Sequence, residues 1–149
     1  EIETNIEENI PHLYADPRLV RQVLINLLTN AIKYSESHSK IEIGVATKDG
    51  NLVFKVIDHG LGIPSDQIDE AMQPFGQVKR REHTSDNQGT GLGLPLAKAM
   101  VELHKGDLEL ISDPGKGTEV RVIFPESRLI PSTEDGKTKA EEKVTNITN

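Results

Sequence analysis

The sequence has 149 residues, enough for one domain with an extension, and its 24 Asp and Glu residues outnumber its 17 Lys and Arg residues to give a net charge of -7. This acidic balance disfavours sequence-independent binding to nucleic acid or to an anionic membrane. The lack of cysteine excludes disulfides, thiolate metal sites and cysteine nucleophiles. No apolar run approaches the roughly 20 residues of a membrane helix. We therefore expect a cytoplasmic chain that is a piece of a longer protein, because it begins at Glu1 rather than at methionine, and membrane attachment of the parent protein stays open.

The first part of the chain predicts an edge strand and a long helix. Residues 2–10 alternate loosely between apolar and polar side chains, which favours a short edge strand that ends before Pro11. Asp16 and Pro17 supply an N-cap and a proline at the first helical position. From there to about Tyr34, apolar side chains recur at helical spacing, and the stripe consists of Leu19, Val20, Val23, Leu24, Leu27, Leu28, Ala31 and Ile32.

A hairpin and a glycine-rich turn are predicted next. Residues 41–45 alternate in polarity, Asp49 and Gly50 give a hairpin signal, and residues 52–57 form the second, antiparallel strand. The segment 58–64 is a tight turn at the end of that strand, and residues 65–68 begin a short helix.

The second half predicts a lid, a helix, two strands and a tail. Residues 72–89 are polar and too long for an ordinary connection, which indicates a lid. Residues 89–93 open a helix that Gly106 stops, and residues 108–110 and 120–124 form two strands around a turn. Because residues 126–149 contain few large apolar side chains, we expect a domain over 1–125 and a flexible tail over 126–149.

A polar stripe on the first helix is the first chemical signal. Gln22, Asn26, Asn30 and Lys33 follow one another at spacings that place them on one face. Such a stripe is usually a solvated face, but asparagine is a poor residue inside a helix. Two asparagines one turn apart indicate a task, because their oxygens suit Mg²⁺ beside phosphates and Lys33 can neutralise a phosphate.

The glycines give a second signal. Gly60 and Gly62 alone are typical of a turn, whereas Gly89, Gly91 and Gly93 precede a helix, where unpaired N–H groups and the helix dipole attract anions. The pattern is neither a dinucleotide fingerprint, since no alternating strand-helix-strand unit surrounds it, nor a P-loop, since no Gly-Lys-Thr or Gly-Lys-Ser closes it.

In chain order these segments resemble the sensor histidine kinases, within the superfamily that also contains gyrase, heat-shock-90 chaperones and mismatch-repair ATPases. The matching segments are NLLTNAIKY (26–34, the N box), DHGLGI (58–63, the first glycine box), PFGQ (74–77, the F box), GTGLGL (89–94, the second glycine box) and GT (117–118, the third glycine box). The resemblance implies an α+β, two-layer α/β sandwich of the Bergerat type, in which a mixed, mainly antiparallel sheet of about five strands is covered on one face by about three helices.

The resemblance also implies a site for MgATP. Asn30 and Asn26 are expected to hold Mg²⁺, with Asn26 and Lys33 as the catalytic groups beside the phosphates. Asp58 is expected to accept a hydrogen bond from the adenine amino group, which favours adenine over guanine because guanine presents a carbonyl there. The full set of expected ATP-binding residues is Asn26, Asn30, Lys33, Tyr34, Asp58, Gly60, Gly62, Ile63, Phe75, Arg80, Gly89, Thr90, Gly91, Leu92, Gly93, Leu94 and Thr118.

Several of these residues are expected to play supporting roles. Tyr34 would border the adenine, and Thr118 would support Asp58 or a water that bridges to the adenine. Phe75 would anchor the lid by packing on the domain. The basic residues 79–81 would support the ATP phosphates, since they stand against a negative net charge.

The activity implied by the resemblance is transfer of the γ-phosphoryl group of ATP to a histidine on a separate dimerisation hairpin of the same parent protein. A response-regulator receiver domain would then accept the phosphoryl group. None of the five histidines of this chain has the sequence context of that acceptor, and they are His12, His38, His59, His83 and His104. The isolated chain is therefore expected to be a monomer that does not phosphorylate itself. The parent protein is expected to be a homodimer. His104 is better explained as a cap at a helix C-terminus, and His59 as a turn residue.

There are three alternatives to this activity. ATP hydrolysis is disfavoured, because the hydrolysing relatives carry a glutamate base where this chain has Asn26. A catalytically silent nucleotide-binding module stays open, although the intact boxes argue against degeneration. A serine kinase of the anti-sigma-factor type on the same fold also stays open, although the F box and the full second glycine box argue against it.

Overall fold

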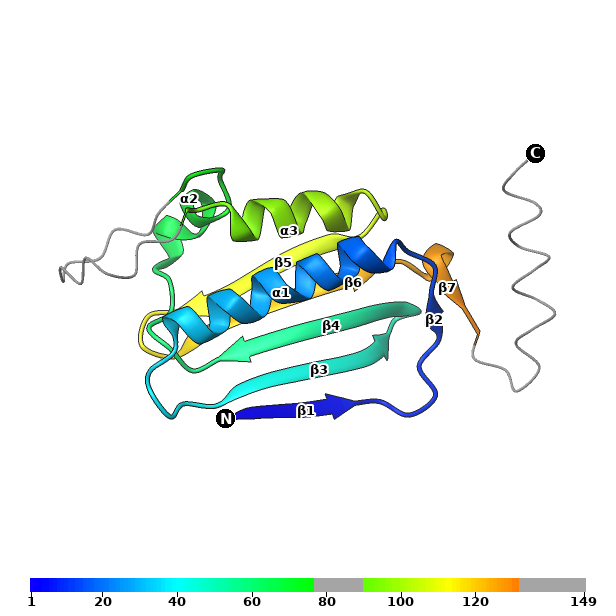
Figure 1. Ribbon diagram of the computed structural model, residues 1–149, viewed down its shortest axis with the longest axis horizontal. Helices are drawn as coiled ribbons and strands as arrows, with labels where there is room; N and C mark the ends of the chain where they lie inside the picture. The colour runs from blue at the N-terminus through cyan, green and yellow to red at the C-terminus, as the bar shows by residue number, and fades with distance from the viewer. Residues whose placement is uncertain (77–89, 132–149) are drawn as a thin grey trace.

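The structure, a computed structural model, describes residues 1–76 and 90–131, and its main feature is a five-stranded sheet with helices on one face (Figure 1). The elements in chain order are β1 (Ile2–Ile6), β2 (His12–Leu13), α1 (Pro17–Tyr34), β3 (Ile41–Lys48), β4 (Asn51–Asp58), the 3-10 turn η1 (Ser65–Gln67), α2 (Ile68–Ala71), α3 (Gly93–Glu102), β5 (Asp107–Asp113), β6 (Gly117–Phe124), the 3-10 turn η2 (Glu126–Arg128) and β7 (Leu129–Ile130). The strand order is β1-β3-β4-β6-β5, with β1 parallel to β3 and the other neighbours antiparallel. This is the expected α+β architecture with a mixed, mainly antiparallel sheet.

The long helix α1 begins and ends where the sequence predicts. The Asp16 side chain accepts a hydrogen bond of 2.8 Å from the backbone N–H of Arg18, and Pro17 follows in the first turn. The predicted apolar stripe is buried along Val23, Leu27 and Ala31, whereas Ile32 at its margin is 59% exposed.

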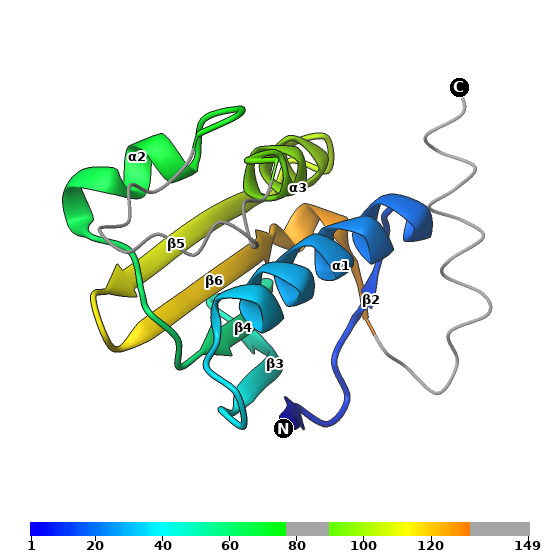
Figure 2. The same ribbon diagram turned by 60° about the vertical axis from the view of Figure 1, so that its left-hand side comes forward.

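The two long helices lie side by side over the sheet, and Figure 2 shows them both on the same face. Helix α1 packs on β4 and on α3, and α3 packs on β5 and β6. Burying one large apolar side chain stabilises a fold by about 1.5–3 kcal/mol, so this shared layer supplies most of the driving force. The most completely buried large side chains are Leu52, Val101, Val122 and Phe124.

The β3–β4 hairpin follows the predicted turn chemistry. Asp49 and Gly50 both have positive φ, at 50° and 79°, as a two-residue hairpin turn requires. The first strand is shorter than predicted, since β1 ends at Ile6 rather than continuing to residue 10. Its five residues are exposed, because neither α1 nor α3 extends over this edge of the sheet.

The expected boundary at residue 125 is wrong for the next few residues. Residues 126–128 form η2, and β7 pairs antiparallel with β2 through His12–Ile130 and Leu13–Leu129. Leu129 is buried, at 8% exposure, and joins the main core. A two-residue strand with one buried leucine is too short to produce a periodic pattern, so it could not be predicted from the sequence. The rest of the predicted tail, 132–149, lies outside the described residues.

No helix among the described residues is long and apolar enough to cross a membrane.

Candidate functional site

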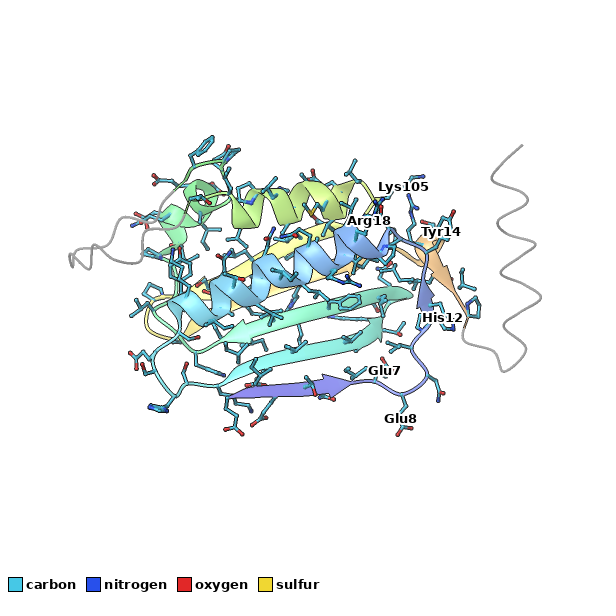
Figure 3. The ribbon with its side chains drawn as sticks, viewed as in Figure 1. Glu7, Glu8, His12, Tyr14, Arg18 and Lys105 are labelled. Atoms are coloured by element: carbon cyan, nitrogen blue, oxygen red, sulfur yellow. The ribbon has the colours of Figure 1, made fainter. Side chains whose placement is uncertain are left out.

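Four segments that carry the sequence signals meet at one end of the domain. The C-terminal end of α1, the N-terminal end of α3, the end of β4 and the turn between β5 and β6 all lie on the left in Figure 1 and remain together in the turned view of Figure 2. The opposite end holds the start of α1 and the end of α3, where Figure 3 labels His12, Tyr14, Arg18 and Lys105. The candidate site therefore lies at the first of these two ends.

Asp58 ends β4 as a buried carboxyl group. It is 7% exposed, and its Oδ1 accepts a hydrogen bond of 2.9 Å from the backbone N–H of Gly60. Burial raises the pKa of the Asp58 carboxyl above its ordinary value, and hydrogen bonds from the backbone of Gly60 and Thr118 oppose that rise. Such a group suits a ligand that donates a hydrogen bond, because the donor would replace the lost hydration.

The first and third glycine boxes are in direct contact. Gly62, with φ of 67°, lies so close to the end of β5 that a Cβ on Gly62 would overlap the carbonyl oxygen of Asp113. A Cβ on Gly117, which has φ of 95°, would likewise overlap the backbone carbonyl oxygen of Asp58. Any side chain at either position would force the two loops apart. A further bond of 3.3 Å, from the N–H of Leu61 to the carbonyl of Tyr34, ties the first glycine box to the end of α1.

Ser112 joins these same segments and was missed by the sequence analysis. Its Oγ accepts from the N–H of Ile63 at 2.8 Å, donates to the carbonyl of Gly117 at 2.9 Å, and lies 2.9 Å from Oγ1 of Thr118. The only sequence signal was a hydroxyl residue near the end of a strand in which apolar and acidic residues mix. Its importance depends on the β5–β6 register, which places Ser112 opposite Thr118.

The polar stripe of α1 faces the start of α3. Nε2 of Gln22 donates to Oδ1 of Asn26 at 3.0 Å, and Nδ2 of Asn26 donates to the carbonyl of Gly93 at 3.3 Å. A Cβ on Gly93 would lie 3.3 Å from the amide nitrogen of Asn30, so glycine lets α3 approach the N box closely. The amide of Asn26 thus links the two helices, because it is engaged at both of its polar atoms.

The expected phosphate end of the site carries positive charge. Nζ of Lys33 lies 5.2 Å from the centre of the Tyr34 ring, a cation–π contact that keeps the ammonium group at the end of α1. In the described part of the chain no side chain caps the N-terminus of α3, which leaves the first N–H groups of a ten-residue helix available to an anion. Within the second glycine box, Thr90 is exposed, Leu92 precedes the helix, and Leu94 packs partly against the core.

The F box contacts the second glycine box through the backbone. The N–H of Phe75 donates to the carbonyl of Gly91 at 3.1 Å, and a Cβ on Gly91 would lie 2.6 Å from the carbonyl oxygen of Gly76. The expectation that the Phe75 ring packs on the domain is wrong, since the residue is 73% exposed. Its backbone has φ of 63°, and together with the bond to Gly91 this left-handed geometry turns the side chain to the outside. Arg80, Gly89 and the rest of segment 77–89 lie outside the described residues.

Two of the histidines that the structure describes, His59 and His104, have hydrogen-bond partners within the domain. Nδ1 of His104 lies 2.8 Å from the carbonyl of Met100, which fits the expected cap at the end of α3, and Nε2 accepts from the N–H of Asp16 at 3.0 Å. Nε2 of His59 lies 3.0 Å from Oε1 of Glu42 on the exposed side of the sheet. His12 is exposed at the end of the domain away from Asp58 (Figure 3).

Metal binding at this site would depend on amide oxygens and on the ligand. The described residues contain no group of three or more His, Asp or Glu side chains that could hold a metal ion. Neutral oxygens such as those of asparagine amides suit Mg²⁺, which usually keeps waters and binds through substrate phosphates. The residues therefore fit a metal ion that arrives with a polyphosphate.

Comparison with known families matches residues 15–128 to the family described as histidine kinase-, DNA gyrase B- and HSP90-like ATPase. The chain is 35% identical over 137 residues to the cell-division control histidine kinase PdhS of Brucella canis, and to PdhS of Brucella abortus by the same measure. Each match covers 87% of this chain and 13% of the relative, so the chain spans 13% of the length of these relatives.

Solved structures of histidine kinases have a similar fold. Full-length ShkA in complex with AMPPNP gives a TM-score of 0.74 at 25% identity, over 89% of this chain and 26% of that one. The mycobacterial sensor histidine kinase MprB gives 0.70 at 25% identity, over 83% and 81%. The catalytic domain of ThkA, in a nucleotide-free form, gives 0.71 at 24% identity, over 85% and 80%, and supports the fold alone. The predicted fold and the resemblance to histidine kinase catalytic domains are confirmed.

Proposed function

The chain belongs to the histidine kinase-, DNA gyrase B- and HSP90-like ATPase family, and from this premise we propose that it binds MgATP and donates the γ-phosphoryl group to a histidine on a separate domain of its parent protein. The observation that carries the proposal is the meeting, at one end of the domain, of a buried carboxyl group and a helix N-terminus that faces asparagines and that no described side chain caps. ATP has the complementary pair of ends, a base with an amino group and a polyanion.

The base would bind at the sheet. Asp58 accepts a hydrogen bond from the adenine amino group, and the glycines at 60 and 62 let the backbone approach the ring, while Tyr34 borders it. The carboxyl group must be ionised to accept well, so its raised pKa makes base recognition sensitive to acid.

The phosphates would bind between the helices. The N–H groups at the start of α3 and the ammonium group of Lys33 neutralise the polyphosphate, and Asn30, whose amide faces Gly93, offers an oxygen to Mg²⁺. Mg²⁺, when bound, would neutralise part of the phosphate charge beside Asn30. The Asn26 amide already joins Gln22 to Gly93, so we propose that it positions α3 and contacts phosphate by its remaining N–H, with direct metal contact left to Asn30.

The transfer step needs positioning more than a base. The imidazole nitrogen of the acceptor forms a bond to the γ-phosphorus while the bond to the β–γ bridging oxygen breaks, and ADP leaves. Neutral imidazole has an ordinary pKa of about 6.5 and is therefore a competent nucleophile at neutral pH. The amide at Asn26 has no useful basicity with which to activate water, so transfer is favoured over hydrolysis. A receiver domain that takes the phosphoryl group onward is the proposed next partner.

Calorimetry and labelling test this proposal. The chain should bind ATP in the presence of Mg²⁺, and Asn30→Ala should abolish the Mg²⁺-dependent part of the affinity while the exposed neighbour variant Thr29→Ala keeps it. Labelled ATP mixed with the chain and with the acceptor hairpin of its parent should leave an acid-labile, base-stable label on the hairpin. No heat with ATP, ADP or a non-hydrolysable analogue would reject the binding role, and tight binding without transfer would favour a silent nucleotide-binding module.

A further inference from the structure

The side chain of Ser112 determines which partner donates and which accepts in the hydrogen bonds around it. It lies at the end of β5, half-buried, with Ile63 of the first glycine box on one side and residues Gly117 and Thr118 of the third glycine box on the other. All three contacts fall between 2.8 and 2.9 Å, so each has the length of a well-formed hydrogen bond.

The protons of this cluster can be placed from chemistry alone. A serine hydroxyl has one proton and two lone pairs. The carbonyl of Gly117 can only accept, so it takes the Ser112 proton, and the N–H of Ile63 can only donate, so it fills one lone pair. The remaining partner of Ser112 is Oγ1 of Thr118, which must therefore donate into the second lone pair. The Thr118 hydroxyl is left with lone pairs and no free proton.

Thr118 stands next to the buried carboxyl group. It is the register partner of Asp58 on adjacent strands, so the two side chains lie on the same face of the sheet, and the backbone N–H of Thr118 donates to the Asp58 carboxyl. Both side chains then present hydrogen-bond acceptors at this end of the sheet. A ligand group that donates hydrogen bonds is favoured here, and a group that accepts them meets repulsion.

We propose that Ser112 is a specificity-determining positioning residue, which selects 6-amino over 6-oxo purine nucleotides by holding the Thr118 hydroxyl as an acceptor beside Asp58. The proposal rests on the proposed nucleotide-binding function and adds to it a residue outside the expected site. Adenine carries an amino group at position 6, whereas hypoxanthine and guanine carry a carbonyl oxygen there. A freely rotating Thr118 hydroxyl would donate to that oxygen, and the bond to Ser112 prevents this rotation.

The test compares ATP with inosine triphosphate, which differs at position 6 and its neighbouring ring nitrogen and keeps the same phosphates. Dissociation constants of both nucleotides with Mg²⁺ are measured by calorimetry on the 149-residue chain and on Ser112→Ala, Ser112→Thr, Thr118→Val and the double variant Ser112→Ala/Thr118→Val. In Ser112→Ala the freed Thr118 hydroxyl can donate to the 6-oxo group of inosine triphosphate, so the preference for ATP should fall about tenfold. This is the effect expected when one hydrogen bond replaces a repulsive contact. Ser112→Thr retains the hydroxyl and should keep the preference.

The ratio of the two affinities separates specificity from folding. A purely structural role for Ser112 would weaken both nucleotides equally and leave the ratio unchanged, and that result would overturn the proposal. If Ser112 acts through Thr118, its removal has no further effect on the ratio in the Thr118→Val background, so an additional change in the double variant would also overturn it. Failure of the unsubstituted chain to bind either nucleotide would instead reject the proposed function, while equal affinity for both would reject the specificity alone.

Discussion

His104 joins the start of α1 to the end of α3, and its removal gives the sharpest stability prediction. The residue is buried, at 7% exposure, and its ring makes two hydrogen bonds and an edge-on contact with Phe124 at 6.2 Å between ring centres. His104→Ala leaves the N–H of Asp16 and the carbonyl of Met100 without the ring and opens a cavity, at a combined cost of roughly 3–4 kcal/mol. His104→Phe keeps the ring volume and loses only the two bonds, so it should cost about 2 kcal/mol.

Urea unfolding followed by circular dichroism measures both changes, with equal slopes expected for all variants. His12→Ala is the matched control, since His12 is an exposed histidine at the same end of the domain and should change stability by less than about 0.5 kcal/mol (Figure 3). A loss in His104→Ala no greater than in His12→Ala would refute the reasoning. A His104→Phe variant as stable as the unsubstituted chain would show that ring packing, and not the two hydrogen bonds, holds the helices together.

Three further predictions concern charge and hydrogen-bond direction. The side-chain hydrogen bond from Arg18 lowers the pKa of Asp16 from 3.8 to about 2. The ionised carboxylate therefore stabilises the fold above pH 3.8, and this contribution is lost as the pH falls toward 2. Asp16→Asn should make stability less dependent on pH in that range, and an unchanged acid-unfolding curve would contradict this prediction. Gln22→Met removes the hydrogen-bond donor to Asn26 and should weaken MgATP binding about fivefold by calorimetry. Gln22→Lys keeps a donor and should bind MgATP as before. Equal losses of MgATP affinity in the two variants would contradict the role of the donor. Acidification through the raised pKa of Asp58 should reduce the ratio of ATP affinity to inosine triphosphate affinity, because a protonated carboxyl group can donate to the 6-oxo group. A ratio that stays constant from about pH 7 to about pH 4 would exclude Asp58 as the group that recognises the base.

The sequence predicted the elements whose signals are local. Asp16 and Pro17 mark the start of α1 because an N-cap and a first-turn proline act within one turn, and the Asp49–Gly50 turn fixes the register of β3 and β4 because both residues adopt positive φ. The pairing of β2 with β7 joins residues more than a hundred positions apart through two-residue strands, which no periodicity reports.

Within the candidate site, the residue types were predictable and their partners were not. The spacing of Asn26 and Asn30 places them on one helix face, but the carbonyl that engages Asn26 belongs to Gly93, 67 residues later. Ser112 gains its role only from the register that sets it opposite Thr118. The orientation of the Phe75 ring follows from a left-handed backbone that a phenylalanine seldom adopts, so the usual preference of aromatic side chains for the core gave the wrong prediction.

In the proposed binding mode, the two ends of the ligand would be recognised by different layers of the fold. Asp58, Ser112 and Thr118 all belong to the sheet and its loops, whereas the polar stripe of α1 and the start of α3 belong to the helices. The layers are joined at the site by the bond from Leu61 to the carbonyl of Tyr34. In the proposed binding mode the sheet would contact the base and the helices would contact the phosphates, with Tyr34 at the end of α1 bordering the base. Changes in the sheet should then alter which base is preferred, while changes in the polar stripe of α1 or at the start of α3 should alter affinity for every nucleotide alike. We therefore expect base selectivity and overall affinity to be separable properties of this domain, each determined by its own set of hydrogen bonds.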